Sequence, residues 1–398
     1  MKKIALIVPA ELPVPSVRGG AVEELVTILI EQNEIEQKAE FLVFSVENED
    51  AKERAKNYKH TKIIYIQVAT LFDRIINRVL RYANKIYKKK TLLDVAHYRK
   101  AYRYLKREKV DAIVAEGGMY HEFRRFAEDY GKENLYLHIH HHLRCTPEID
   151  DIFGNAIGIS EFATKEWMCT TNAKDTEAYV VYNCVNEDKF VPRISRDERA
   201  EIRKRFGFTD EDIVVLYCGR ILEVKGVREL LMAVKEIENP HVKLLIIGNA
   251  DFAINTQTPY LKEVQELVET VGDRVRFTGY IPNSELYQYY QSADIQVIPS
   301  LWEEAAGLVA IEGMLSELPL IVTKSGGLVE YATADVAIQV EREQIIEELK
   351  REISALALNE EQRKQMAALG MERAKAFSKK RFYESFIEVI DHEENGKE

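Results

Sequence analysis

The sequence predicts an α/β protein with two doubly wound domains, each built on a parallel sheet. Short apolar runs without polar alternation, typical of strands buried on both faces, alternate with longer helical patterns. The length of 398 residues suggests two or three domains, at roughly 150 residues for each. A polar, proline-bearing segment, NCVNEDKFVPRISRDERAEIRK, indicates a domain boundary near residues 185–195.

Each half of the chain carries its own set of expected strands, with helical patterns between them. In the first half the apolar runs are KKIALIV, EFLVFSV, KIIYIQV, DAIVAEG, NLYLHIH and NAIGIS. In the second half they are DIVVLYCGR, VKLLIIGN, RVRFTGY, DIQVIPS and LPLIVTK. Doubly wound sheets bind ligands beyond the carboxyl ends of their strands and in clefts between domains. We therefore expect domains of residues 1–188 and 189–375 that face a cleft.

Composition excludes several classes of protein. Hydrophobic residues make up 46% and charged residues 30% of the chain, as in ordinary globular proteins. The four cysteines are scattered without a CxxC, so neither a disulfide framework nor a zinc ribbon is indicated, which fits a reducing cytoplasm. No apolar run approaches the roughly 18 residues needed to span a bilayer. MKKIALIVPA is interpreted as a first strand rather than a signal peptide, because no small-residue cleavage site follows it.

One segment is strongly basic, although the net charge of the chain is -11. Residues 73–109 contain 13 Lys/Arg and 3 Asp/Glu, a local charge of +10. In LFDRIINRVLRYANKIYKKK, apolar residues at helical spacing are interleaved with Arg74, Arg78, Arg81 and Lys85. A basic amphipathic helix of this kind can lie on an anionic membrane surface. The alternative is a surface helix docked on its own domain with a solvated basic face.

Glycines at three strand ends indicate a phosphate ligand. No GxGxxG follows a strand and no GxxxxGK[ST] is present, so dinucleotide and P-loop sites lose their main support. The glycine-bearing strand ends are instead PSVRGGAVEE, CGRILEVKG and EEAAGLVAIEG. Backbone N–H groups and the positive end of a helix suit phosphate at such turns. Arg220 and Lys225 in the second of them suit a diphosphate.

The second half resembles the family 4 glycosyltransferases of the GT-B fold. GRILEVKG, EEAAGLVAIEG, NCVNEDKF and KSGGLVEY match four motifs of that family in order and spacing. ELPVPSVRGGAVEE, near the beginning, is similar to the spore coat protein SA-like branch. The chain departs from the family pattern at four positions, where it has Cys184, Asn186, Ala306 and Gly313.

The resemblance implies a retaining transferase that takes its sugar from a nucleotide diphosphate. Glu312 would accept hydrogen bonds from the ribose, and Glu304 from the donor sugar. Arg220 and Lys225 would stabilise the departing diphosphate. The set implied for donor binding is Gly19, Gly20, Arg220, Lys225, Tyr280, Ala306, Gly307, Leu308 and Glu312. The family requires neither a metal nor another cofactor, and Asp210–Glu211–Asp212, the one D-x-D, is expected to be a solvated loop.

The histidine-rich stretch LHIHHHL allows three interpretations. Family members often place a histidine at the end of this strand facing the donor sugar, and His140 matches best, with His141 second. On a continuing strand His138, His140 and His142 would share one face and could bind zinc. A structural histidine is the third interpretation. The preceding strand end, Glu116–Gly117–Gly118, is expected on the acceptor side.

The remaining expectations concern partners and alternative functions. The acceptor would be a lipid-linked glycan or a protein, in the synthesis of a surface polysaccharide, glycolipid or glycoconjugate, with the enzyme cytoplasmic or peripheral at the inner face of the membrane. We expect no nucleic-acid partner. A helix over residues 376–392 should pack back on the first domain, as in other GT-B chains. The alternatives are a non-catalytic GT-B partner subunit and a sugar-nucleotide epimerase on the same fold.

Overall fold

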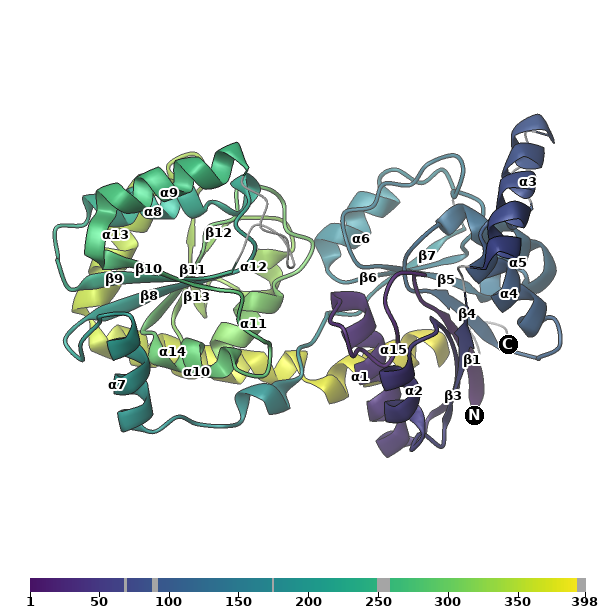
Figure 1. Cartoon of the computed structure of the whole chain (residues 1–398), viewed down its shortest axis with the longest axis horizontal. Coiled ribbons are helices and arrows are strands. Elements are labelled where there is room, and N and C mark those ends of the chain that lie inside the picture. The colour runs from purple at the N-terminus through teal and green to yellow at the C-terminus, as the bar shows by residue number, and fades with distance from the viewer. Residues whose placement is uncertain (68–69, 88–91, 174, 249–257, 392–398) are drawn as a thin grey trace. The chain divides into compact units, whose positions relative to one another are not determined.

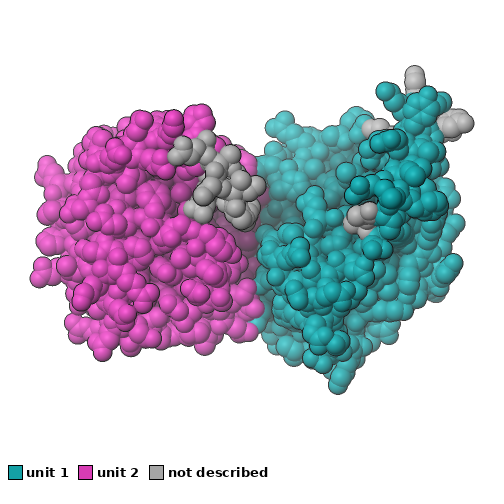
Figure 2. All heavy atoms as spheres, in the orientation of Figure 1, with its two compact units in different colours: residues 1–183, 379–398 teal, residues 184–378 magenta. Residues whose placement is uncertain are grey.

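The computed structural model describes residues 1–67, 70–87, 92–173, 175–248 and 258–391. The chain forms two compact units (Figures 1 and 2). Unit 1 comprises Met1–Asn183 and the C-terminal stretch from Lys379, and unit 2 comprises Cys184–Ser378. The boundary expected after residue 188 falls inside a short 3-10 helix, Glu187–Phe190.

Unit 1 is built on a seven-stranded parallel sheet of order β3-β2-β1-β4-β5-β6-β7. Its strands are β1 (Lys2–Ile7), β2 (Ala39–Val46), β3 (Thr61–Ile66), β4 (Ala112–Ala115), β5 (Leu135–Ile139), β6 (Asn155–Gly158) and β7 (Glu177–Val180). The helices between them are α1 (Ala21–Glu36), α2 (Glu49–Ala55), α3 (Leu71–Tyr87), α4 (Ala96–Leu105), α5 (Arg124–Tyr130) and α6 (Glu161–Met168). The inner strands are buried almost throughout, because helices cover both faces of the sheet (Figure 1).

The last helix of the chain, α15 (Lys379–Asp391), is part of unit 1 and packs against α1. Phe386 is buried, with its ring centroid 6.5 Å from that of Phe41 on β2. The Tyr383 hydroxyl donates to Asn33 Oδ1 at 2.6 Å. Phe377, which falls in the predicted helical stretch 376–392, precedes α15 and stacks on Tyr331 in unit 2 at 4.8 Å between ring centroids.

Unit 2 is built on a six-stranded parallel sheet of order β10-β9-β8-β11-β12-β13. Its strands are β8 (Ile213–Cys218), β9 (Val242–Ile247), β10 (Val275–Gly279), β11 (Ile295–Ile298), β12 (Leu320–Thr323) and β13 (Ala337–Val340). Its helices are α7 (Arg196–Arg205), α8 (Val227–Glu236), α9 (Pro259–Val271), α10 (Leu286–Ser292), α11 (Leu308–Leu315), α12 (Leu328–Tyr331), α13 (Ile345–Leu358) and α14 (Glu360–Ala374). In Figure 1, α8, α9 and α13 lie on one side of this sheet, and α10 and α14 on the other.

Two strands were not predicted from the sequence, and both are edge strands. β7 ends the first sheet and β13 ends the second. The four residues of β7 are exposed or half-buried, and the central two of β13 are half-buried. Edge position alone does not explain the omission, because the other two edge strands, β3 and β10, were predicted. β7 (EAYV) and β13 (AIQV) have four residues each and include Glu177 and Gln339, which shorten their apolar runs.

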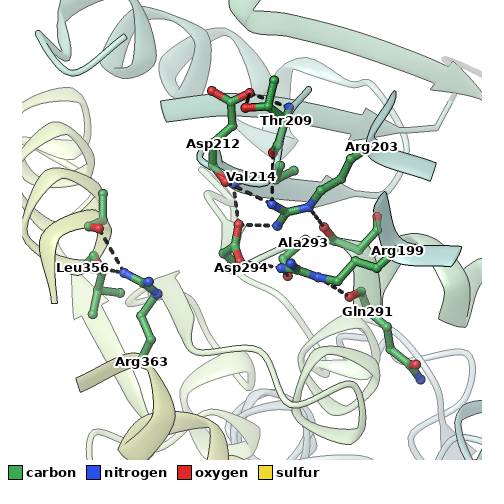
Figure 3. Close-up of polar contacts among 12 residues, drawn as sticks. Arg199, Arg203, Thr209, Asp212, Val214, Gln291, Ala293, Asp294, Leu356 and Arg363 are labelled. Atoms are coloured by element: carbon green, nitrogen blue, oxygen red, sulfur yellow. Dashed lines mark hydrogen bonds and ion pairs between the residues drawn. The ribbon is translucent and has the colours of Figure 1, made fainter. Parts of the chain in front are cut away.

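Helix α7, which follows the polar segment between the units, begins at a capping box and is anchored by a buried ion pair. Ser195 and Glu198 satisfy each other's backbone N–H groups at its start. The buried Arg203 guanidinium pairs with Asp294 at 2.6 Å and donates to the Asp212 carbonyl at 3.0 Å (Figure 3).

The expectation that Asp210–Glu211–Asp212 is solvated is wrong for its last residue. The Asp212 side chain is buried and accepts from the Thr209 amide at 2.7 Å (Figure 3). Only Asp210 and Glu211 are exposed. The aspartate closes the turn that leads into β8.

Candidate active site

Two loops at the carboxyl ends of neighbouring strands form the floor of the candidate site. One loop connects β8 to α8, and the other connects β11 to α11. The two loops lie side by side because β8 and β11 are adjacent in the sheet. The Leu301 amide donates to the Val224 carbonyl at 2.9 Å and ties the loops together. Gly226 has a φ of 70°, and a Cβ there would lie 1.9 Å from the Pro299 carbonyl oxygen, so only glycine permits this approach.

The loop before α11 is held in turn by the glycine-rich segment after β12. The Gly327 amide donates to the Glu304 carbonyl at 2.6 Å, and the Glu304 amide donates to Ser325 Oγ at 3.1 Å. A Cβ on Gly307 would come within 3.0 Å of Tyr331 Cβ, so this glycine allows α12 to pack against the start of α11. These contacts fix the position of Glu304 and of the first turn of α11.

The four charged residues predicted for the donor site lie around one pocket of unit 2. Its volume is about 450 Å³. It is lined by Tyr217, Cys218, Gly219, Arg220, Lys225, Ile247, Gly248, Tyr280, Ile281, Asn283, Leu286, Ile298, Ser300, Glu304, Leu308, Val309 and Glu312. Tyr280 and Leu308 from the predicted set also line it, whereas Ala306 and Gly307, both among the described residues, are not part of its wall.

Lys225 and Glu304 form an ion pair inside this pocket. Lys225 Nζ lies 2.6 Å from Glu304 Oε1, and the Ser300 hydroxyl donates to the same carboxylate oxygen. Both charged side chains are largely buried, and the ammonium lies 5.2 Å from the centre of the Trp302 ring. Ser300 and Trp302 lie just before the EEAAGLVAIEG motif, and no feature of that motif singled them out.

Glu312 lines the same pocket, close to Tyr290 and Cys218. Burial raises its pKa, while the Tyr290 hydroxyl, which donates to Oε2 at 2.7 Å, partly offsets this. Burial and the Glu312 charge raise the pKa of Cys218 to about 12, so its thiol stays protonated. Tyr290 comes from α10, and no pattern in the sequence marked it.

The first turn of α11 forms part of the wall of the same pocket. Leu308 and Val309 line it, while the Ala310 and Ile311 amides bond to the Gly307 carbonyl. The first N–H groups of a helix have no partner within the helix and point away from its start. Together with Arg220 and Lys225, they make this wall suited to an anion.

The other predicted residues lie in unit 1, in two places. Gly19 and Gly20 have φ values of 82° and 97° and precede α1. Glu116 follows β4 and is completely buried, and Gly117 and Gly118 continue the chain with φ values of 127° and 88°.

Glu116 is bonded to two histidines of the neighbouring strand. Glu116 Oε2 lies 2.9 Å from His138 Nδ1 and 2.8 Å from His140 Nε2. Burial raises the pKa of Glu116, but the two histidines outweigh it and hold that pKa at about 2. Burial lowers the pKa of His140 to about 4, so a carboxylate faces two rings, and that of His140 is neutral at neutral pH.

Each group of this cluster also has a second polar atom that takes no part in these hydrogen bonds. Among the described residues, Glu116 Oε1, His138 Nε2 and His140 Nδ1 are buried without a hydrogen-bond partner. If each histidine donates to Glu116, then His140 Nδ1 carries a lone pair and can accept an O–H from a ligand. Glu116, His138 and His140 each offer one possible metal-ligand atom, and these atoms lie within 4.8 Å of one another, so the cluster could also hold a metal.

His142 does not join this cluster. Its Nδ1 lies 2.6 Å from Oε2 of Glu166 on α6. The expectation of three histidines on one face assumed a continuing strand, but β5 ends at Ile139 and the chain then leaves the sheet. His141 is part of this segment beyond the strand and has a lowered pKa because of partial burial.

Acidification is expected to destabilise unit 1. His97 is buried, bonds to the Val8 carbonyl at 3.0 Å, and has a pKa of about 4 because burial disfavours its charged form. Between pH 6.5 and 4 the unfolded chain binds more protons than the folded one. Stability is therefore full above pH 6.5 and is lost as the pH falls toward 4, by on the order of 3 kcal/mol for this residue. Urea unfolding followed by Trp167 fluorescence, at several pH values, measures the slope.

The matched variants are His97→Gln, which keeps a donor but cannot titrate, and His241→Gln at an exposed position of unit 2. The first should flatten the pH dependence of unit 1, and the second should leave it unchanged. An unaltered slope in His97→Gln would show that other groups cause the acid sensitivity.

Comparison with known proteins supports the interpretation of the pocket. Residues 198–373 match the family described as Glycosyl transferases group 1. Spore coat protein SA of Bacillus subtilis is 26% identical over 348 residues, covering 82% of this chain and 81% of that protein. An uncharacterized glycosyltransferase of Methanocaldococcus jannaschii is 32% identical over 174 residues, which span 43% of each chain.

Solved structures show the fold. The crystal structure of Anabaena HepE in complex with UDP has a TM-score of 0.71 at 17% identity and covers 98% of this chain and 100% of that one. A glycosyltransferase from Rickettsia africae has a TM-score of 0.76 at 16% identity, covering 100% of both chains. The expected GT-B fold of two doubly wound parallel-sheet domains is thereby confirmed.

Proposed function

Because residues 198–373 match the family of group 1 glycosyl transferases, we propose that this chain moves a sugar from a nucleoside diphosphate to an acceptor hydroxyl, with retention of anomeric configuration. The observation that carries the proposal is the meeting of Arg220, Lys225, Glu304 and Glu312 around one pocket. Solved structures of Anabaena HepE with UDP and with UDP-glucose support a nucleotide sugar as the donor.

The residues of the pocket are proposed to bind three parts of the donor. Arg220, Lys225 and the first-turn amides of α11 would hold the diphosphate, because a bidentate cation, a compact cation and free N–H groups suit its oxygens. Glu312 would accept the ribose hydroxyls, since a carboxylate can bond both members of a vicinal diol. Glu304, already bonded to Lys225, would reach the hydroxyls of the sugar.

Transfer requires one bond to break and one to form at the anomeric carbon. The bond to the phosphate oxygen breaks, and its electron pair stays on the diphosphate, where Arg220 and Lys225 stabilise the charge. The acceptor oxygen then attacks from the same face, and its proton passes to the departing phosphate oxygen. This route uses no protein nucleophile, and it needs no metal to stabilise the leaving group.

In unit 1, His140 is the residue proposed to bind a hydroxyl of the donor sugar. Its buried Nδ1 has no hydrogen-bond partner among the described residues, and Glu116 orients the ring from the other side. An acceptor of O–H groups in this position suits a sugar hydroxyl. Gly19 and Gly20 would approach the donor through their backbone, and Glu116–Gly117–Gly118 would lie toward the acceptor.

For the acceptor we propose a lipid-linked glycan, with a protein as the alternative, in the synthesis of a surface polysaccharide, glycolipid or glycoconjugate. The relative named lipopolysaccharide 1,2-N-acetylglucosaminetransferase, from Salmonella typhimurium, supports the first choice at 25% identity over 309 residues. The protein would then work in the cytoplasm or at the inner face of the membrane.

Nucleotide release from a panel of sugar nucleotides, with and without acceptor glycans, tests the function. A transferase releases nucleotide in an acceptor-dependent manner, and NMR of the product shows whether the anomeric configuration is retained. Release or epimerisation without acceptor would identify an epimerase instead, and absence of any turnover would favour a non-catalytic partner subunit. The same assay in a chelator tests the proposed independence from metal.

A further inference from the structure

Helix α3 (Leu71–Tyr87) turns its polar residues toward its own unit. Asp73 is buried and pairs with Lys100 at 2.7 Å, and Asn77 accepts from Arg99 at 2.9 Å. Asn84 is also buried and bonds both the carbonyl and the amide of Leu92. An amphipathic helix on a globular domain usually buries its apolar stripe. Polar contacts hold α3 instead.

The large apolar residues of α3 consequently face outward. Six of them are 57–78% exposed: Leu71, Phe72, Ile75, Val79, Tyr82 and Ile86. Because successive helical residues rotate by about 100°, these six fall within one strip of the helix surface. The helix lies at the periphery of unit 1 in Figure 1. Exposed apolar strips of this size on a globular domain mark interaction surfaces.

A basic strip runs beside the apolar one. The side chains of Arg74, Arg78, Arg81 and Lys85 are exposed and occupy the adjoining sector of the same helix. Arg81 has one acidic neighbour, Asp94, at 3.7 Å, and its side chain remains 69% exposed. The outward side of α3 is therefore apolar along one flank and cationic along the other, in a chain whose net charge is -11.

We propose that α3 docks unit 1 on an anionic lipid surface. The apolar flank would enter the boundary between headgroups and acyl chains, and the basic flank would contact the phosphates. No helix among the described residues is both long and apolar enough to cross a bilayer, so α3 would lie along the surface. This proposal does not depend on the chemistry of the pocket in unit 2.

A second copy of the chain is the competing occupant, and charge argues against it. A two-fold contact through the apolar flanks would bring the basic flank of each copy to the same interface. Like charges brought together oppose association, whereas anionic lipid neutralises them. The charge pattern therefore favours the membrane.

Flotation of the full chain with vesicles tests the proposal. We expect binding to vesicles of phosphatidylglycerol and phosphatidylcholine, weaker binding to phosphatidylcholine alone, and loss of binding at high salt. Arg74→Glu/Arg78→Glu/Arg81→Glu should weaken the partition at least roughly tenfold, because each basic side chain at an anionic surface contributes about 1 kcal/mol. Phe72→Ser/Ile75→Ser/Val79→Ser should weaken it to a similar degree.

Two control variants match these changes elsewhere on the chain. Arg205→Glu/Lys364→Glu/Lys375→Glu alters the net charge equally at exposed positions of unit 2. Ile35→Ser/Val191→Ser/Leu358→Ser removes three equally exposed apolar side chains. Both should float like the wild type, and circular dichroism should show that all four variants are folded.

Three results would overturn the proposal. The wild type could fail to float with anionic vesicles, or the two α3 variants could float as well as the controls. Alternatively, sedimentation could show a dimer that Phe72→Ser/Ile75→Ser/Val79→Ser dissociates, without any flotation of the wild type, and the second copy would then be the occupant.

Discussion

Replacing Lys225 or Arg220 with alanine is expected to lower kcat on the order of 10²–10³-fold, with little change in stability. Both side chains line the pocket. In the proposed reaction the positive charge of each would be needed most when the diphosphate gains charge in the transition state. Since Lys225 also pairs with Glu304, its loss leaves that carboxylate bonded to Ser300. Steady-state kinetics with a saturating donor separates the effect on kcat from the effect on KM.

The control is Lys235→Ala, at an exposed position on α8, the helix that follows the Lys225 loop. It should retain wild-type turnover. If Lys225→Ala and Arg220→Ala also do so, the leaving group is stabilised by other residues and the assignment of the diphosphate to this wall is wrong. A large loss of stability in either variant would show instead that the residue supports the loop.

Phe386→Ala is expected to destabilise unit 1 by about 3–5 kcal/mol. The ring is completely buried and packs near Phe41 and His138, at 6.5 and 6.1 Å between centroids. Truncation leaves a cavity that α15 cannot close, because two other hydrogen bonds hold this helix in place. Tyr383 on α15 donates to Asn33, and Lys2 donates to the Ile390 carbonyl of α15. The free energy of unfolding of a typical domain is only about 5–15 kcal/mol, so this change is a large part of the total.

The two tryptophans of the chain allow each unit to be followed separately. Trp167 is buried in unit 1, and Trp302 lies in unit 2. In a Trp302→Phe background, urea unfolding should show a lower midpoint for Phe386→Ala. The exposed Leu369→Ala on α14 is the control and should change stability by less than about 0.5 kcal/mol. An unchanged Trp167 transition in Phe386→Ala would mean that α15 does not stabilise unit 1.

Most strands, and the meeting of the charged residues around the pocket of unit 2, were predictable from the sequence because they depend on local patterns. A strand buried on both faces needs a continuous apolar run, and Ile295–Ile298 or Val242–Ile247 can hardly be interpreted otherwise. The loops after β8 and β11 carry Lys225 and Glu304, which are far apart in sequence. Parallel neighbours end at the same edge of a sheet, so finding the strands was enough to bring these two residues together.

Three features required the tertiary structure. Glu116 meets His138 and His140 because β4 pairs with β5 in a register that aligns Ala115 with Leu137, and register is a property of two strands together. Tyr290 reaches Glu312 only because α10 packs beside α11. The short edge strands β7 and β13 are recognised only by their pairing with β6 and β12.

Helix α3 shows the same division within a single element. Its sequence determined that it is a helix with an apolar strip and a basic strip, because both follow from the spacing of residues along the chain. It did not determine which side faces the protein. That was decided by Asp73, Asn77 and Asn84, whose partners come from outside the helix, at Lys100, Arg99 and Leu92. Periodicity reports the faces of a helix, but only the packing of the surrounding chain decides which face is buried.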